Sequence, residues 1–192
     1  MVVGRTLPFM LLLTAATLAG GALITFAPQL VDAAMITAGG LLLLTATAAI
    51  SRWRFGVLAD RYGTRRLRWI LVLCNVIGLL LVAWAVITPE QPRTVALLAG
   101  MAVVGIGYGG LQNLTLVDAL AVVPPRQVDV SSALWNIGFD TGTGLGSLLV
   151  GFIAAGFSFP IALLVVAACS LLTLPLAFVR TRVPDRRISQ IS

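Results

Sequence analysis

Six apolar stretches occupy most of this 192-residue chain, and they constrain its fold more than any other feature. A helix needs about 20 apolar residues to cross the roughly 30 Å hydrocarbon core of a bilayer. The stretches predict spanning helices, by residue number, at about 7–29, 33–53, 68–88, 94–118, 130–155 and 161–179. Transmembrane β-strands would instead give short segments of alternating polarity. We therefore expect an all-α membrane protein in which residues 1–192 form a single six-helix bundle.

The composition supports a membrane protein and argues against nucleic-acid binding. The chain is 59% hydrophobic and 10% charged, whereas soluble domains carry about 25% charged residues. All 13 basic residues are arginine, and they flank the apolar stretches rather than forming a soluble basic face. With six helices, every arginine except Arg93 lies on the side of the chain ends, including the basic tail at 180–192. The positive-inside rule then predicts a multi-pass protein of the bacterial inner-membrane type, with both termini cytoplasmic.

The chain lacks the residue sets that common enzymes require. It has no histidine, and Cys74 and Cys169 both lie inside apolar stretches, so neither a metal site nor a disulfide framework is indicated. Residues 105–110 match G-x-G-x-x-G, but that motif binds dinucleotides only between a strand and a helix. We expect a protein that is not an enzyme and uses no cofactor or metal, with membrane lipids as neighbours and no nucleic-acid partner.

A densely charged segment, residues 54–66, separates the second and third apolar stretches. We expect a tight loop here: Gly56 ends or bends one helix, and Gly63 allows a turn that a side chain would resist. Asp60 is placed to cap the start of the next helix. The arginines are costly in lipid and favour the anionic headgroups of the cytoplasmic surface.

This charged segment resembles the signature loop of the major facilitator superfamily, G-x-x-x-D-R-x-G-R-R. The loop lies between the second and third helices of each half of those transporters. The matching residues are Gly56, Asp60, Arg61, Gly63, Arg65 and Arg66. Thr64 departs from the pattern, because the family usually has a basic residue there. The resemblance implies that Asp60 and its arginines help to latch the inner face against an opposite helical bundle.

Polar residues within the fourth and fifth apolar stretches are candidates for a transport path. Asp140 is the clearest case, since a charge at the centre of a membrane helix costs about 2.5–3.5 kcal/mol. At 100° per residue, the side chains of Asn136, Asp140, Thr143 and Ser147 fall on one side of a helix. The candidate substrate or proton path comprises Asp140, Asn136, Thr143, Tyr108, Gln112 and Asn113. A hydrogen-bonded or protonated Asp140 with no transport role is the alternative.

Glycines spaced along the same two stretches predict close helix packing. Small residues four apart let membrane helices approach one another closely. The predicted packing residues are Gly105, Gly109, Gly138, Gly142 and Gly146.

The resemblance extends over nearly the whole chain. Within the family, the chain resembles most the carboxy-terminal half of an efflux-type permease. A drug/proton antiporter would usually carry a Gly-Pro motif in the fifth helix of its amino-terminal half, and no proline occurs between Val130 and Phe159. The resemblance implies alternating access by two rocking six-helix bundles, with proton-coupled export of a small-molecule substrate. One bundle encloses no central cavity, so a second bundle is expected.

The origin of that second bundle stays open at this point. The chain is a transporter fragment, one of two separately encoded halves, or one subunit of a homodimer. A six-helix membrane scaffold or assembly protein is the alternative from another functional class.

Overall fold

The computed structural model describes residues 2–88 and 92–180, which form helices joined by short turns. The elements are α1 (Val2–Leu30), α2 (Ala34–Tyr62), α3 (Thr64–Ala85), α4 (Thr94–Ala121), η1 (Pro125–Gln127), α5 (Val128–Gly156), α6 (Phe159–Leu172) and η2 (Leu174–Phe178). Six helical spans within these ranges are long and apolar enough to cross a membrane. The predicted all-α, six-helix membrane fold is therefore confirmed. Of the predicted basic tail at 180–192, all but Arg180 lies outside the described residues.

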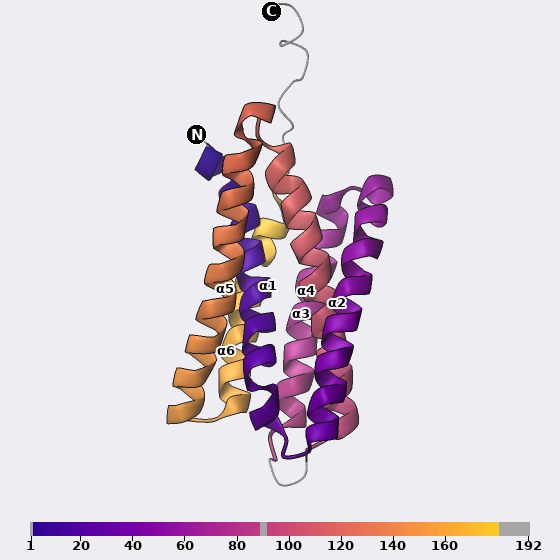
Figure 1. Ribbon diagram of the computed structural model, residues 1–192, viewed down its shortest axis with the longest axis vertical. Coiled ribbons are helices and arrows are strands. Elements are labelled where there is room, and N and C mark those ends of the chain that lie inside the picture. The colour runs from indigo at the N-terminus through magenta and orange to yellow at the C-terminus, as the bar shows by residue number, and fades with distance from the viewer. Residues whose placement is uncertain (1, 89–91, 181–192) are drawn as a thin grey trace, which may run out of the picture.

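The helices run side by side along one axis, and α1 and α4 occupy the centre of the bundle (Figure 1). The most extensive contacts join α2 to α4, α1 to α5 and α3 to α4, and α1 and α4 also contact each other. The two largest contacts are related by an internal repeat. If the first three helices are matched to the last three, α2 corresponds to α5 and α4 corresponds to α1, so the α2–α4 contact corresponds to the α5–α1 contact. This relation fits the nested three-helix repeats of some transporter folds. The outer helices α2 and α5 are the least buried.

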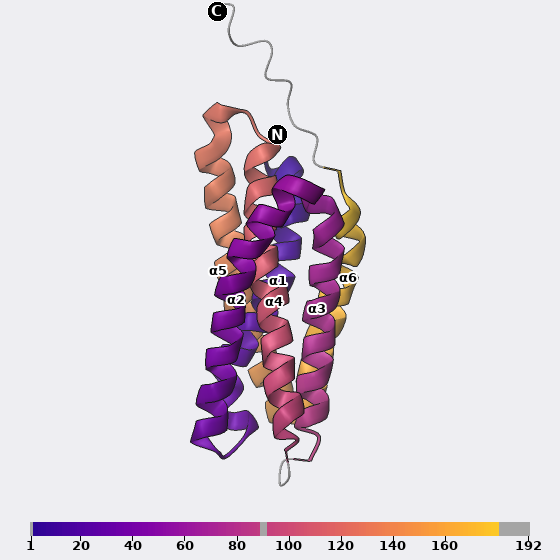
Figure 2. The same ribbon diagram turned by 90° about the vertical axis from the view of Figure 1, so that its right-hand side faces the viewer.

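The charged segment at 54–66 is mostly helical, which corrects the predicted loop. The second helix continues beyond residue 53 to Tyr62, and α3 begins at Thr64 rather than near 68. Gly63 alone reverses the chain, with a φ of 77° that favours glycine (Figure 2). Gly56 lies inside α2 and does not end it. The helix continues because leucine, alanine and arginine are good helix formers in water as well as in lipid.

Two smaller expectations also differ from the structure. Asp60 lies in the last turns of α2, and the N-cap of α3 is Gly63, which makes no side-chain capping bond. The aspartate therefore does not cap α3, because the one-residue turn leaves it on the preceding helix. The sixth helix was expected to reach residue 179, but α6 stops at Leu172 and the 3₁₀ turn η2, with Pro175 near its start, follows it. Proline lacks the N–H that would continue the helix.

The hydrophobic core is continuous in one half of the bundle and divided in the other. The largest cluster of buried residues lies toward the end that carries the α1–α2, α3–α4 and α5–α6 turns. Two smaller clusters, centred on Leu71 and on Phe9, lie toward the opposite end. Buried polar side chains, including Arg68, Gln112 and Asp118, lie in that second half. This half of the bundle therefore contains the candidate functional residues.

Candidate functional site

One end of the bundle carries nearly all of the described basic side chains. At this end α1 begins, α2 meets α3, α4 meets α5, and the chain leaves η2 (Figures 1 and 2). We call it the arginine-rich end, because Arg93 is the only arginine of the described ranges that lies in a turn of the opposite end. The arrangement agrees with the predicted arginine distribution and places the signature segment at the same end as the start of α1 and the end of η2.

A buried ion pair joins α3 to α4 just inside the arginine-rich end. Arg68 is fully buried, and its guanidinium donates to the Asp118 Oδ2 atom at 2.6 Å. Thr64 donates its hydroxyl to Asp118 Oδ1 at 2.7 Å. Thr64 therefore contacts the carboxylate from a position where the family usually has a basic residue. The cation itself comes from Arg68, one helical turn further along α3.

The same guanidinium also ties down the end of the last helical segment. Its Nε donates to the Ala177 carbonyl oxygen at 3.2 Å, and its Nη2 donates to the Val179 carbonyl oxygen. The charge lies 5.1 Å from the centre of the Phe9 ring of α1. Arg68 thus connects α1, α3, α4 and the η2 segment. Its burial is tolerated because a carboxylate, two carbonyl oxygens and an aromatic face lie beside it.

The signature residue Gly56 provides room for a contact between α2 and α4. Asn113 of α4 donates its amide to the Arg52 carbonyl oxygen at 2.6 Å. A Cβ atom on Gly56 would lie 2.8 Å from that amide nitrogen. Farther along the same contact between α2 and α4, the Ser51 hydroxyl donates to the Ile106 carbonyl oxygen at 2.6 Å. Asn113, which was predicted to line the transport path, bonds through its amide to the backbone of α2.

The remaining signature residues lie on the surface of the arginine-rich end. Asp60 and Arg61 are exposed in the last turns of α2, and Arg65 and Arg66 are exposed in the first turn of α3. Among the residues that the structure describes, the ion pair between Arg68 and Asp118 is the only one. The exposed signature charges are therefore available to another surface.

The glycines of α5 lie against α1. Cβ atoms on Gly142 and Gly146 would overlap the α1 backbone, in the first case 2.5 Å from the Thr14 carbonyl oxygen. Gly138 has ordinary van der Waals room, and the Thr14 hydroxyl donates to its carbonyl oxygen at 3.1 Å. On α4, Gly109 lies equally close to the α2 backbone at Ala48. Gly105 packs in the same way one turn earlier.

The polar residues of α5 do not all face one side. Asn136 and Asp140 are exposed, whereas the Thr143 hydroxyl bonds to the Phe139 carbonyl oxygen on its own helix at 3.0 Å. The Ser147 hydroxyl lies 2.8 Å from Thr25 Oγ1 of α1. The polar residues of α5 therefore extend from its exposed surface to its contact with α1.

Gln112 of α4 is buried, and its side-chain amide makes no hydrogen bond of normal geometry in the described parts of the chain, although the Tyr108 hydroxyl lies close enough to interact with it. Tyr108, one turn earlier, lies across Gly20 of α1, where a Cβ would lie 2.5 Å from the tyrosine ring. A buried unsatisfied polar group costs about 1–3 kcal/mol, so it indicates an unseen partner or a functional role. Gln112 is the strongest candidate for binding inside the bundle.

These features define a class of protein before any comparison is made. Six apolar helical spans with few, specifically placed buried charges are those of a multi-pass α-helical membrane protein. The sequence model of the Major Facilitator Superfamily matches residues 9–191, and the chain belongs to this family. It is therefore a transport protein of the membrane, as the signature segment predicted. A search of curated proteins gave no match to this chain.

Sequence reasoning missed the most conspicuous buried site. The sequence placed Arg68 at the start of the third predicted helix and gave Asp118 no part in the candidate site, so their pairing was not predicted. One signal was available: an arginine and an aspartate each lie at the same end of adjacent apolar stretches. Buried charges in membrane helices pair with one another. Asn75, which donates to Ser170 Oγ at 2.9 Å inside the bundle, carried no comparable signal.

Proposed function

We propose that this chain is one six-helix bundle of an alternating-access transporter that exports small organic molecules in exchange for protons. In this proposal a second bundle, supplied by another copy or a separate chain, completes the central path. Membership of the Major Facilitator Superfamily supports membrane transport. Proton coupling, export and the second bundle are the steps that we add.

The observation that carries the proposal is the exposure of Asp140. The residue lies 12 positions after the start of α5 at Val128, or about 18 Å along a helix that rises 1.5 Å per residue. It is exposed and makes no ion pair or hydrogen bond with another residue of the described ranges. An isolated carboxylate facing lipid at this depth costs about 2.5–3.5 kcal/mol. A second bundle or a water-filled path beside α5 removes that cost.

Such a carboxylate can carry the coupling proton. Aspartates inside membrane proteins form proton relays in pumps and transporters. Protonation would neutralise Asp140 in one access state, and deprotonation would occur when the path opens to the other side. Gln112 and Tyr108 lie on the neighbouring α4 and would supply polar contacts to the substrate.

The arginine-rich end gives the orientation of the proposed transporter. Positively charged residues are retained on the cytoplasmic side of membrane helices. We therefore place the signature segment and both chain ends in the cytoplasm. In this orientation the exposed Asp60 and Arg61 face the inner end of the second bundle and can act as part of the latch.

The first test is the mass of the complex in its membrane. We expect native mass measurement in nanodiscs, checked by cross-linking in the native membrane, to give two six-helix chains per particle. A purely monomeric particle would remove the proposed second bundle. In that case the alternative of a scaffold or a transporter fragment would replace the working carrier.

The second test measures proton movement in proteoliposomes with a lumenal pH dye. A panel of small organic cations and neutral compounds is added, and the compounds that drive proton flux in the wild-type protein are retained. We expect Asp140→Asn to abolish this flux and Asp140→Glu to retain part of it. Asp129→Asn is the matched control, because Asp129 is exposed in the first turn of the same helix. Unchanged flux in Asp140→Asn would remove its proposed role.

A further inference from the structure

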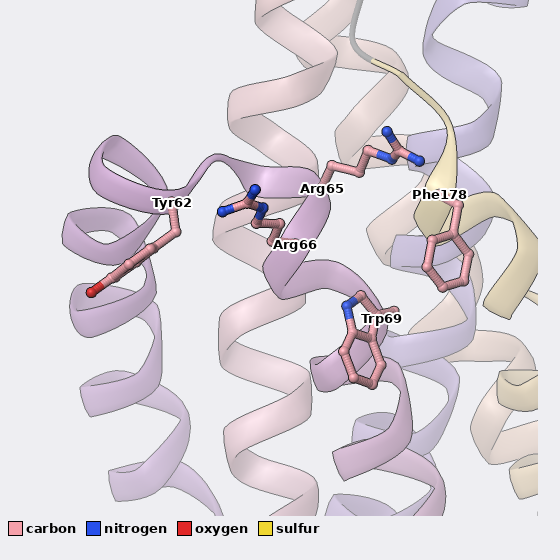
Figure 3. A pocket seen from close by; sticks show the side chains of 5 residues that line it. All are labelled: Tyr62, Arg65, Arg66, Trp69 and Phe178. Atoms are coloured by element: carbon pink, nitrogen blue, oxygen red, sulfur yellow. The ribbon is translucent and has the colours of Figure 1, made fainter.

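Three elements surround an open pocket of about 420 Å³ on the outer surface of the arginine-rich end (Figure 3). The residues that line it are Tyr62 of α2, Arg65, Arg66 and Trp69 of α3, and Phe178 of η2. The transport path proposed above does not use this pocket, which lies at a different place in the bundle.

The pocket separates positive charge from aromatic surface. The Arg66 guanidinium lies beside the α2–α3 turn, the Arg65 guanidinium extends toward the segment that carries Phe178, and the Trp69 and Phe178 rings lie farther toward the middle of the bundle (Figure 3). Neither arginine forms an ion pair with a described carboxylate, in contrast to Arg68, which is buried against Asp118. The two charges are therefore uncompensated in the described structure.

We infer that this pocket binds the headgroup of an anionic phospholipid from the leaflet at the arginine-rich end. A guanidinium group binds phosphate oxygens through paired N–H donors. Indole and phenyl rings are favoured just below, where the headgroup region meets the hydrocarbon. The order of groups in the pocket thus follows the order of groups in a lipid: phosphate beside the arginines, and acyl chain along the rings.

The exposed rings favour a lipid over a free phosphate ion. Trp69 is 37% exposed and Phe178 is 47% exposed, so a pocket that held only phosphate would leave both rings against water or unrelated lipid. An acyl chain attached to the bound headgroup covers them. The inference does not depend on the proposed proton coupling or on Asp140.

Titration of lipid into the detergent-solubilised protein, followed by native mass spectrometry, tests the inference. Phosphatidylglycerol is compared with phosphatidylcholine that carries the same acyl chains. We expect the Kd of the most tightly bound phosphatidylglycerol to rise by about 25-fold in Arg65→Gln/Arg66→Gln. Each surface arginine contributes about fivefold to the affinity for an anionic lipid. The matched control is Arg5→Gln/Arg126→Gln, which removes two exposed arginines at the same end but outside the pocket.

Three outcomes would overturn the inference. Equal weakening in the control variant would assign the binding to general surface charge. Equal affinity for phosphatidylcholine would show that the anionic headgroup is not recognised. Displacement of the lipid by millimolar inorganic phosphate, but not by chloride at the same ionic strength, would identify a free phosphate site.

A fluorescence measurement keeps the inference testable if the double variant does not fold. Phosphatidylglycerol brominated on its acyl chains is mixed with the protein, and the Trp69 emission is taken as the difference between wild type and Trp69→Phe. We expect this difference emission to be quenched at lower mole fractions of brominated phosphatidylglycerol than of brominated phosphatidylcholine. Equal quenching by the two lipids would contradict the proposed site.

Discussion

Removing one member of the buried Arg68–Asp118 pair should destabilise the bundle far more than removing both. Asp118→Asn keeps the shape of the side chain but leaves the guanidinium of Arg68 buried without its counter-charge. Breaking a buried ion pair in this way costs about 3–5 kcal/mol. That loss is a large share of the roughly 5–15 kcal/mol that stabilises a typical folded protein.

The double variant Arg68→Met/Asp118→Leu removes both buried charges together. Replacing a buried ion pair by apolar side chains of similar volume is often neutral or stabilising. The guanidinium also bonds to the Ala177 and Val179 carbonyl oxygens, so the double variant loses those bonds. We allow about 1–3 kcal/mol for the two bonds, since a net hydrogen bond contributes roughly 0.5–1.5 kcal/mol. The double variant should therefore be more stable than either single variant, Arg68→Met or Asp118→Asn.

Unfolding of the purified protein in mixed detergent, followed by tryptophan fluorescence, measures these differences. Asp129→Asn is the control, because it removes one exposed carboxylate and should change the free energy of unfolding by less than about 1 kcal/mol. A full cycle of single and double variants isolates the coupling between the two side chains. If Asp118→Asn matches the wild type, or if the double variant loses the sum of the two single losses, the ion pair does not hold the helices together.

Two further predictions follow from helix packing and from the buried amide. Gly142→Ala places a methyl group 2.5 Å from the Thr14 carbonyl oxygen and should lower the free energy of unfolding by about 1–3 kcal/mol. Gly144→Ala on the same helix meets nothing within 4 Å and should be neutral or stabilising, so equal losses in the same unfolding assay would refute the packing argument. Gln112→Leu removes an unsatisfied buried amide and should leave stability unchanged or higher while reducing substrate-driven proton flux. Reduced stability together with normal flux would contradict the proposed binding role of that residue.

Much of the architecture follows from the sequence alone, and the reason is local. The length and apolarity of each stretch determine that it spans the membrane as a helix, whatever its neighbours do. The distribution of arginines around those stretches places nearly all of them at one end. Gly63 was predicted to form the turn, and it has the positive φ that such a turn requires.

The site depends on how the helices rotate and cross, which no single stretch determines. Asn113 shares a segment with Gln112, yet it bonds to the α2 backbone while Gln112 is buried beside Tyr108 inside the bundle. Ser147 contacts α1 although Asp140, seven residues earlier, is exposed. The sequence by itself determined six membrane helices, the end of the bundle that carries the arginines, and the family. Only the tertiary structure decided that Arg68 meets Asp118, because two charges 50 residues apart become neighbours through the packing of α3 against α4.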